Sequence, residues 1–302
     1  MVSEQVRVYV GADRSQRLAV KVLEHSIKRH TQLPVEVCAM VDLPVRVPQD
    51  PLNWQRTGFS FSRFCIPELA GYEGKAIYLD ADMLVFSDIA QLWNIPFDGA
   101  KVIIQEELPE ARAQTNQKKG APAKRVKQCA VMLLDCDRLS WKVDEIVSSL
   151  DAGDYNYEKL MYDLCILEDS EIRYAIPFCW NSMEYYQPEE TALIHYTDMA
   201  TQPWVYAQNE YGHLWLEEVR LMLKTGKITQ AEIKKEIELG YFRPSLLTAL
   251  RWEHRIPAAL KPTFHNLLRA MDKPYKPHEE VYRQKKIRKQ AIKERELAAT
   301  KA

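Results

Sequence analysis

The 302-residue sequence has little glycine, no long apolar run and no closely spaced pair of cysteines. Without an apolar run of 18 residues it has no candidate for a membrane-spanning helix, and the opening MVSEQVRVYVG lacks the layout of a signal peptide. The six cysteines are scattered without the C-x-x-C spacing of a zinc or redox site, which favours a reducing compartment. We therefore expect a cytoplasmic protein that does not span a membrane.

The net charge is close to zero, at −1, but it is unevenly distributed. Residues 261–302 contain 12 Lys+Arg and 5 Asp+Glu, a balance of +7, so the preceding residues carry −8. The acidic body, and the scarcity of aromatic residues among the basic ones, argue against nucleic acid as a partner. The basic tail predicts either a weakly amphipathic helix in peripheral contact with the inner membrane surface or a disordered, solubilising segment.

The first forty residues predict a β-α-β unit. A short strand over 6–10 ends at Gly11-Ala12-Asp13, residues 15–29 have apolar positions at helical spacing, and 35–41 is a second strand. A unit of this kind implies a parallel sheet that binds its ligands at the carboxyl ends of the strands.

The rest of the chain continues as an α/β protein and then becomes helical. We expect further strands over 76–79, 83–86, 101–104, 131–134, 173–176 and 192–195, and helices over 59–69, 141–150, 157–167, 214–224, 229–239 and 244–252. Residues 107–127 have no periodic apolar face and are expected to be a surface loop. The predicted organisation is an α/β domain over 1–210, a helical extension over 211–260 and the basic tail over 261–302.

The central stretch, KAIYLDADMLVFSDIAQLW, carries the strongest chemical signal. Its apolar strand is followed directly by Asp80-Ala81-Asp82. In a strand-like segment residues i and i+2 point the same way. Both carboxylates can then face one ion, and hard oxygen ligands suit Mg²⁺ or Mn²⁺. The alternative is that the two aspartates simply form a turn at the end of a strand.

A histidine supports the metal interpretation. His195 ends the late strand over 192–195, so in a parallel α/β sheet it would lie at the same edge as Gly11-Ala12-Asp13 and the two aspartates. A neutral imidazole can complete the coordination of a divalent ion held by two carboxylates. We therefore predict a metal site formed by Asp80, Asp82 and His195.

The run FSRFCIPELAGYEGKAIYLDADMLVFSDIAQLW resembles the central signature of family 8 glycosyltransferases, the group of glycogenin-like enzymes and bacterial galactosyl- and glucosyltransferases. Arg63, Asp80, Asp82 and Asp88 match that pattern. The opening strand with Gly11-Ala12-Asp13 resembles the family's first nucleotide-binding loop, and IHYTDMATQPW resembles its late H-x-x-G-x-x-K-P-W motif. The resemblance covers about the first 205 residues, and the order of the motifs is more specific than any one of them.

This resemblance implies a fold, a reaction and a set of partners. The fold would be of GT-A type, a Rossmann-like mixed sheet flanked by helices, with 1–210 as the nucleotide-sugar-binding catalytic domain. The reaction would be the metal-dependent, retaining transfer of a hexose from UDP-glucose or UDP-galactose, with Mn²⁺ or Mg²⁺ as cofactor. The acceptor would be a carbohydrate, a glycolipid or a small molecule.

The resemblance also assigns site residues. The metal ligands would be Asp80, Asp82 and His195. The residues that bind the nucleotide-sugar would be Gly11, Ala12, Asp13, Arg63 and Asp80. The catalytic positions would be Gln128, Asp163 and Asn181, the last of these as a contact on the acceptor side or as a loop-capping amide.

The sequence departs from the family at three places. Gln128-Cys129-Ala130 stands where the family has asparagine, serine and glycine, and Asp163-Leu164 lacks the glutamine of its D-Q pair. Thr201-Gln202 stands where a lysine would neutralise the diphosphate. Basic residues of the predicted loop either supply this charge or form a solvated surface: Lys118, Lys119, Lys124, Arg125 and Lys127.

The sequence also allows other interpretations. A second D-x-D, Asp135-Cys136-Asp137, is attributed to capping of the helix expected from Ser140. A sugar-1-phosphate nucleotidyltransferase would need a glycine-rich loop after the first strand, where GADRSQ has one glycine. A catalytically weak nucleotide-sugar-binding or scaffold protein is the other alternative, suggested by the missing lysine and glutamine.

Overall fold

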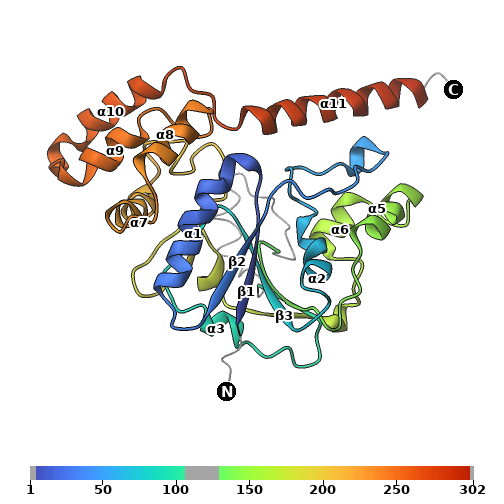
Figure 1. Cartoon of the computed structure of the whole chain (residues 1–302). Coiled ribbons are helices and arrows are strands. Elements are labelled where there is room, and N and C mark those ends of the chain that lie inside the picture. The colour runs from blue at the N-terminus through green and yellow to red at the C-terminus, as the bar shows by residue number, and fades with distance from the viewer. Residues whose placement is uncertain (1–4, 106–128, 300–302) are drawn as a thin grey trace.

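A computed structural model describes residues 5–105 and 129–299 and has a mixed β-sheet with helices on both faces (Figure 1). The predicted surface loop, together with Gln128 and the basic residues Lys118, Lys119, Lys124, Arg125 and Lys127, lies outside the described residues. Among the described residues, no helix has the length and apolarity needed to span a bilayer.

The main sheet has six strands in the order β2-β1-β3-β6-β5-β7. Strands β2, β1 and β3 are parallel, β6 runs antiparallel to both β3 and β5, and β7 is parallel to β5. The central strands are almost continuously apolar, as expected for a sheet covered on both faces. The strands are β1 (Val6–Gly11), β2 (Val35–Met40), β3 (Lys75–Asp80), β5 (Val102–Gln105), β6 (Val131–Asp135) and β7 (Ile172–Ile176).

Different helices cover the two faces of this sheet. On one face α1 (Arg17–Arg29) packs Val20, Leu23 and Ile27 against alternate residues of the strands. The other face is covered by α2 (Ile66–Leu69), α5 (Val143–Ala152) and α6 (Tyr157–Asp163). The core therefore lies on both sides of the sheet and leaves the carboxyl ends of β1 and β3 for a site.

A second sheet of three strands lies beside the first, in the order β4-β9-β8. It consists of β4 (Met83–Val85), β8 (Ser182–Met183) and β9 (Leu193–His195). The prediction that His195 ends a strand of the main sheet is therefore wrong. Strand β9 pairs antiparallel with β4 instead.

The helical extension packs on α1 through an aromatic cluster. The rings of Trp204, Trp215 and Phe242 pack against one another in tilted and edge-to-face arrangements, and they share a buried cluster with Leu18 and Val22 of α1. The extension consists of α7 (Gly212–Lys224), α8 (Gln230–Glu238) and α9 (Leu246–Trp252).

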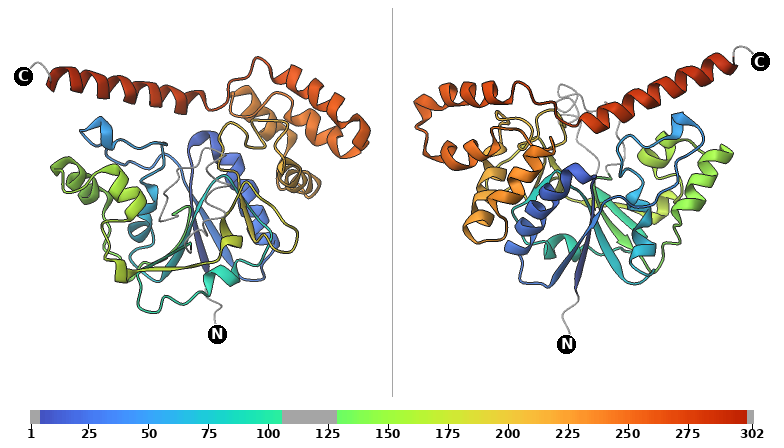
Figure 2. Two further views of the ribbon diagram at one scale, coloured as in Figure 1. Left: turned by 180° about the vertical axis from the view of Figure 1, so that it is seen from behind. Right: turned by 45° about the horizontal axis from the view of Figure 1, so that its top comes forward.

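The basic tail is helical in the structure. It forms α10 (Lys261–Asp272) and α11 (Glu279–Ala299), and α11 extends across the molecule (Figures 1 and 2). Contact of this tail with a membrane stays a prediction. The remaining elements are short: α3 (Ala90–Trp93), η1 (Arg14–Gln16), η2 (Pro51–Asn53), η3 (Ser62–Cys65), η4 (Asp169–Glu171), η5 (Phe178–Asn181), η6 (Glu253–Arg255) and η7 (Ala258–Leu260).

Candidate active site

Asp80 and Asp82 lie where the chain leaves the main sheet for the second one. Asp80 is the last residue of β3, and Asp82 directly precedes β4. Ala81 between them is buried, and its small side chain fits between the two sheets. The N–H of Asp80 donates to the carbonyl of Ala130 at 3.2 Å, and the carbonyl of Asp82 accepts from the N–H of Tyr196 at 2.8 Å. Strand pairing thus fixes the backbone of both aspartates.

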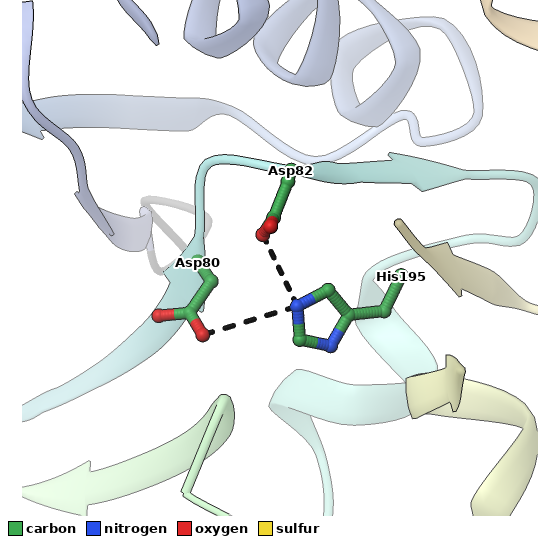
Figure 3. Close-up of side chains that lie close together, drawn as sticks. All are labelled: Asp80, Asp82 and His195. Carbon is green, nitrogen blue, oxygen red and sulfur yellow. Dashed lines mark ion pairs between the residues drawn. The ribbon is translucent and has the colours of Figure 1, made fainter. Parts of the chain in front are cut away.

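His195 reaches the aspartates through the pairing of β4 and β9, which sets it opposite Met83. Its Nε2 atom lies 3.1 Å from Oδ1 of Asp82 and 3.9 Å from Oδ2 of Asp80 (Figure 3). The three ligand atoms all lie within 4.8 Å of one another. In an octahedral site with bonds of about 2.1 Å, neighbouring ligand atoms are about 3 Å apart, so these side chains fit one divalent ion after a small movement.

A buried chain of amides orients the imidazole of His195. The Oδ1 atom of Asn181 lies 2.8 Å from Nδ1 of His195, while the amide nitrogen of Asn181 donates to Oε1 of Gln105 at 2.7 Å. Because the amide nitrogen donates to Gln105, Nδ1 of His195 acts as the donor to Asn181. Nε2 therefore faces the carboxylates, with a proton when the imidazole is charged and with a lone pair for an ion when it is neutral. A partner of this kind on the far ring nitrogen is usual for a metal-binding histidine.

Tyr78 and Arg63 both contact the carboxylate of Asp80. The hydroxyl of Tyr78 donates to Oδ1 of Asp80 at 2.5 Å, and Nη2 of Arg63 lies 3.7 Å from the same oxygen. Arg63 also donates to the Tyr78 hydroxyl at 3.2 Å and to the carbonyl of Cys129 at 2.6 Å. The guanidinium is buried, so it supports Asp80 and has little exposed surface to offer a ligand.

Burial and mutual repulsion affect the protonation of the cluster. Burial raises the pKa of Asp80, although Arg63 and His195 act in the opposite direction. Burial alone would lower the pKa of His195, but the carboxylates of Asp82 and Asp80 outweigh it, and the pKa of His195 is raised. The cluster thus favours one added positive charge, either a proton or a cation that replaces it.

The predicted nucleotide-binding loop lies beside this cluster. In the parallel pairing of β1 with β3, Gly11 is opposite Asp80. A Cβ atom on Gly11 would lie 2.5 Å from the hydroxyl of Tyr78, so glycine leaves the room in which Tyr78 reaches Asp80. The carboxylate of Asp13 accepts a bond from the N–H of Ser15 at 2.8 Å, which fixes the turn that follows.

The other candidate residues lie outside the group formed by Asp80, Asp82 and His195. Asn181 is buried behind His195, as described above. Asp163 ends α6, directly before Leu164, whose φ is 48°. The catalytic roles of Asn181, Asp163 and Gln128 stay predictions, as do the nucleotide contacts of Gly11, Ala12, Asp13 and Arg63.

The second D-x-D lies at the opposite edge of the sheet. Because β6 runs antiparallel to β3, Asp135 pairs with Lys75, at the end of β3 away from Asp80. The predicted capping role is wrong, since α5 begins at Val143 and its N-cap is Lys142. Strand direction therefore explains why this pair of aspartates is not part of the candidate metal site.

Four residues at or near the cluster escaped the sequence prediction. Tyr78 could have been found, because it lies two residues before Asp80 on the same face of β3. Gln105 had no local signal. Gln202 donates to Oδ2 of Asp82 at 2.8 Å and was noted only as the replacement of a lysine. His278 directly precedes α11 and is buried, although it belongs to a tail expected to pack little.

The chain is similar in sequence to a known protein family and to a plant protein. The model of the family described as Glycosyl transferase family 8 matches residues 12–208. Protein CDI of Arabidopsis thaliana is 29% identical over 241 residues, which cover 73% of this chain and 88% of CDI.

Solved structures show the same fold at low sequence identity. The galactosyltransferase LgtC, in complex with donor and acceptor sugar analogs, has a TM-score of 0.50 and 14% identity over 70% of this chain and 95% of LgtC. The glycosyltransferase GlyE of Streptococcus pneumoniae TIGR4 has a TM-score of 0.51 and 14% identity over 71% of this chain and 60% of GlyE. The mixed sheet flanked by helices is thus the GT-A architecture of these enzymes. The family match covers well over half of the chain, so the protein belongs to glycosyl transferase family 8 and is a glycosyltransferase.

Proposed function

We propose that the protein transfers a hexose from a UDP-sugar, UDP-glucose or UDP-galactose, with retention of configuration and with Mn²⁺ or Mg²⁺ as cofactor. The acceptor would be a carbohydrate, a glycolipid or a small molecule. The observation that supports this proposal is the convergence of Asp80, Asp82 and His195 beside Gly11 at one end of β1 and β3. A nucleotide in the predicted loop would then have its diphosphate next to the ion site.

In this proposal one set of residues binds the ion and a second set keeps those ligands in position. A bound divalent ion supplies Lewis-acid stabilisation of the negative charge on the departing diphosphate. Asp80 and Asp82 provide the negative charge that holds the ion, and Asn181 keeps the lone pair of His195 directed at it. Tyr78 and Arg63 keep Asp80 in position through the contacts described above.

The proposal is tested with a panel of UDP-, GDP-, CDP- and ADP-sugars, each with and without Mn²⁺, by thermal unfolding and calorimetry. A ligand that binds only the folded protein at a hundredfold excess over its Kd adds about 2.7 kcal/mol to the free energy of unfolding. We expect this increase in the free energy of unfolding for a UDP-sugar in the presence of Mn²⁺ and not in its absence. Equal stabilisation with and without metal, or none by any nucleotide, would contradict the proposal.

Two matched substitutions localise the ion. Asp82→Asn should abolish Mn²⁺-dependent affinity for UDP, because it removes a charged ligand. Asp137→Asn changes the second D-x-D at the opposite edge of the sheet and should leave that affinity unchanged. Mn²⁺-dependent binding that survives in the Asp82 variant would refute the assignment.

A catalytically weak UDP-sugar-binding protein is the second candidate. It is favoured by Gln202, which stands where the family resemblance expects a lysine and donates to Asp82. Metal-dependent hydrolysis of the UDP-sugar without an acceptor would argue for the transferase. Tight UDP-sugar binding with neither hydrolysis nor transfer would argue for the binding protein.

A further inference from the structure

A cleft outside the candidate active site lies between three segments that are far apart in the sequence. Its volume is about 810 Å³, and it is lined by residues 49–56 around η2, by residues 150–159 at the turn from α5 to α6, and by α11. Figures 1 and 2 show α11 crossing from the helical extension to this side of the molecule. None of the described metal-binding, nucleotide-binding or catalytic candidates lines the cleft, so it is a separate site.

Two arginine side chains from different segments meet in this cleft. Arg56, which follows η2, donates from Nη1 to the carbonyl of Leu52 at 3.1 Å, and Arg288 of α11 donates from Nη2 to the same carbonyl at 3.2 Å. The two nitrogen atoms are therefore no further apart than the sum of these distances, 6.3 Å. Two guanidinium groups this close repel each other, and an anion bound to both removes that repulsion. Arg56 and Arg288 are called the arginine pair below.

Backbone carbonyls take up only part of the hydrogen-bonding capacity of the arginine pair. Arg56 donates from Nη1 to the carbonyls of Leu52 and Trp54. Arg288 donates from Nε to the carbonyl of Pro51 at 2.9 Å and from Nη2 to that of Leu52. A guanidinium has five N–H groups, so each arginine retains three for another partner. These include both N–H groups on Nη2 of Arg56 and both on Nη1 of Arg288.

The protein fixes Arg56 before any ligand binds. The guanidinium lies over the ring of Tyr157, 3.8 Å from its centre, and Tyr157 is buried against Phe61. The N–H of Tyr157 donates to Oδ1 of the buried Asn53 at 3.0 Å, which connects the start of α6 to η2. Donors that are already held in place lose less entropy on binding, so this arrangement favours a specific ligand.

The carboxylates of the cleft do not neutralise the arginine pair. Asp50 pairs with Arg295 of α11, and Asp151 pairs at 3.1 Å with an arginine that follows β2. Asp154 and Glu158 are exposed, as is the lysine that follows Glu158. Within the described residues, none of these four acids forms an ion pair with the arginine pair. The two positive charges are thus left for an anion from solution.

We propose that this cleft binds a phosphate group and that the arginine pair holds it. A phosphate monoester carries about −1.5 to −2 charges at neutral pH, which balances two guanidinium groups, whereas a carboxylate carries one. Its oxygens accept charge-assisted hydrogen bonds from the planar N–H fork of arginine. The phosphate belongs to a soluble ligand or to a lipid headgroup, which share this chemistry. Because the pair joins α11 to the η2 segment, a bound phosphate also fastens the tail to the α/β domain.

Calorimetry of inorganic phosphate with the metal-free full chain tests the inference. We expect saturable binding, and Arg56→Leu and Arg288→Leu should each weaken it by about tenfold or more, because each removes hydrogen bonds to a charged group. Arg283→Leu is the matched control, since Arg283 is on α11, is exposed and does not line the cleft. It should bind phosphate as the wild type does. Acetate at the same ionic strength should bind about tenfold more weakly than phosphate.

A second variant keeps the inference testable if the arginine variants do not fold. The double change Asp154→Asn and Glu158→Gln removes two exposed negative charges from the edge of the cleft, so it should strengthen phosphate binding by about threefold. Glu189→Gln with Glu190→Gln removes two exposed acids that do not line the cleft and should leave the affinity unchanged. A purely structural role of the arginine pair would produce no such increase in affinity.

Vesicles of phosphatidylcholine, with and without phosphatidic acid, distinguish the two sources of the phosphate. Binding to phosphatidic acid that Arg56→Leu abolishes would assign the site to a lipid headgroup. Binding of inorganic phosphate without binding to these vesicles would assign it to a soluble ligand.

Four results would overturn the inference. The first is that the wild type binds neither inorganic phosphate nor phosphatidic acid. The second is that Arg56→Leu and Arg288→Leu, correctly folded, bind as the wild type does. The third is that acetate binds as tightly as phosphate, and the fourth is that the double change of Asp154 and Glu158 brings no increase in affinity.

Discussion

Gln202 donates a hydrogen bond from Nε2 to Oδ2 of Asp82 at 2.8 Å, although the two residues are 120 positions apart. The side chain of Gln202 is completely buried, and its amide also donates to the carbonyl of Tyr196. A residue at the position of an expected phosphate ligand therefore orients a predicted metal ligand. The departure from the family pattern thus has a structural role in this chain.

Replacing Gln202 should weaken the metal site without destroying it. Gln202→Leu removes the donor that orients Asp82, and the loss of such outer partners typically lowers metal affinity by about 10- to 100-fold. We expect a weaker Mn²⁺ affinity by calorimetry, at the low end of that range. Gln208→Leu, a matched glutamine on the same loop, should leave Mn²⁺ affinity unchanged. Equal Mn²⁺ affinities in wild type and Gln202→Leu would show that Asp82 needs no such partner.

Gly11→Ala should destabilise the protein. The added Cβ would lie 2.5 Å from the hydroxyl of Tyr78 and 3.0 Å from the ring of Phe59, so the buried Tyr78 and the partly buried Phe59 must move. Overpacking of this kind costs about 1–3 kcal/mol, and it would also displace the donor to Asp80. The measurement is the free energy of unfolding in urea, together with Mn²⁺ affinity.

Gly58→Ala is the control for that substitution. The nearest atom to a Cβ at Gly58 is Cβ of Asp13, at 4.0 Å, so the new methyl group fits. We expect its free energy of unfolding to change by less than about 0.5 kcal/mol. Similar losses of unfolding free energy in Gly11→Ala and Gly58→Ala would mean that the contact with Tyr78 does not cause the destabilisation.

Glu218→Gln should loosen the helical extension. Glu218 on α7 is buried, and its carboxylate accepts a bond from Nη2 of Arg29 on α1 at 2.8 Å and also pairs with His25. Hydrogen bonds to charged groups contribute about 1.5–3 kcal/mol each, and Arg29 is partly exposed, so we expect a loss of about 1–2 kcal/mol. Urea unfolding measures it. The exposed neighbour Glu217, changed to Gln, should have almost no effect, and equal effects would refute the assignment.

The contact of α8 with α1 should depend on pH. A hydrogen bond from Lys21, followed by bonds with Thr229, lowers the pKa of Glu232 to about 2 from 4.5. Because the folded pKa is the lower one, this stabilisation is complete above about pH 4.5 and is lost as the pH falls toward about 2. Lys21 and Glu232 are about half exposed, so the effect is about 1 kcal/mol or less.

The contribution of Glu232 is measured by comparing the free energies of unfolding of two proteins, the wild type and Glu232→Gln. The free energy of unfolding of wild type minus that of Glu232→Gln should be positive near pH 6, smaller near pH 3, and close to zero only at about pH 2 and below. Glu238→Gln, on the same helix, should show little difference from wild type at either pH. A difference that does not shrink on acidification would mean that Glu232 stabilises the helix by packing and not by charge.

Local patterns predicted many of the elements because short-range physics sets them, but the helix expected over 59–69 is only a 3-10 turn, Ser62–Cys65, followed by the short α2, Ile66–Leu69. The strand expected over 131–134 is β6 (Val131–Asp135), and the helix expected over 214–224 is α7 (Gly212–Lys224). The helix expected over 157–167 is shorter, since Leu164 adopts a left-handed conformation and ends α6 at Asp163. The predicted metal ligands Asp80, Asp82 and His195 do meet in space.

Long-range pairing is what the sequence did not reveal. His195 was expected at the edge of the main sheet, but its strand pairs with β4, and nothing local to 192–195 determines that partner. The role of Gln202 depends on a hydrogen bond to a residue far away in the chain. His278 lies in a segment whose composition is that of a solvated surface, yet it is buried.

The single buried residue Ala81 separates two predicted metal ligands at the junction of the two sheets. Asp80 ends the six-stranded sheet, whereas Asp82 directly precedes β4 and His195 ends β9 of the three-stranded one, which shares a buried cluster with the helical extension. An ion held by all three side chains is therefore a cross-link between the two sheets. By thermodynamic reciprocity, a change that favours the arrangement of the two sheets in which the three ligand atoms converge raises the affinity for the ion, and chelation of the ion removes the stabilisation that the ion gives to this arrangement.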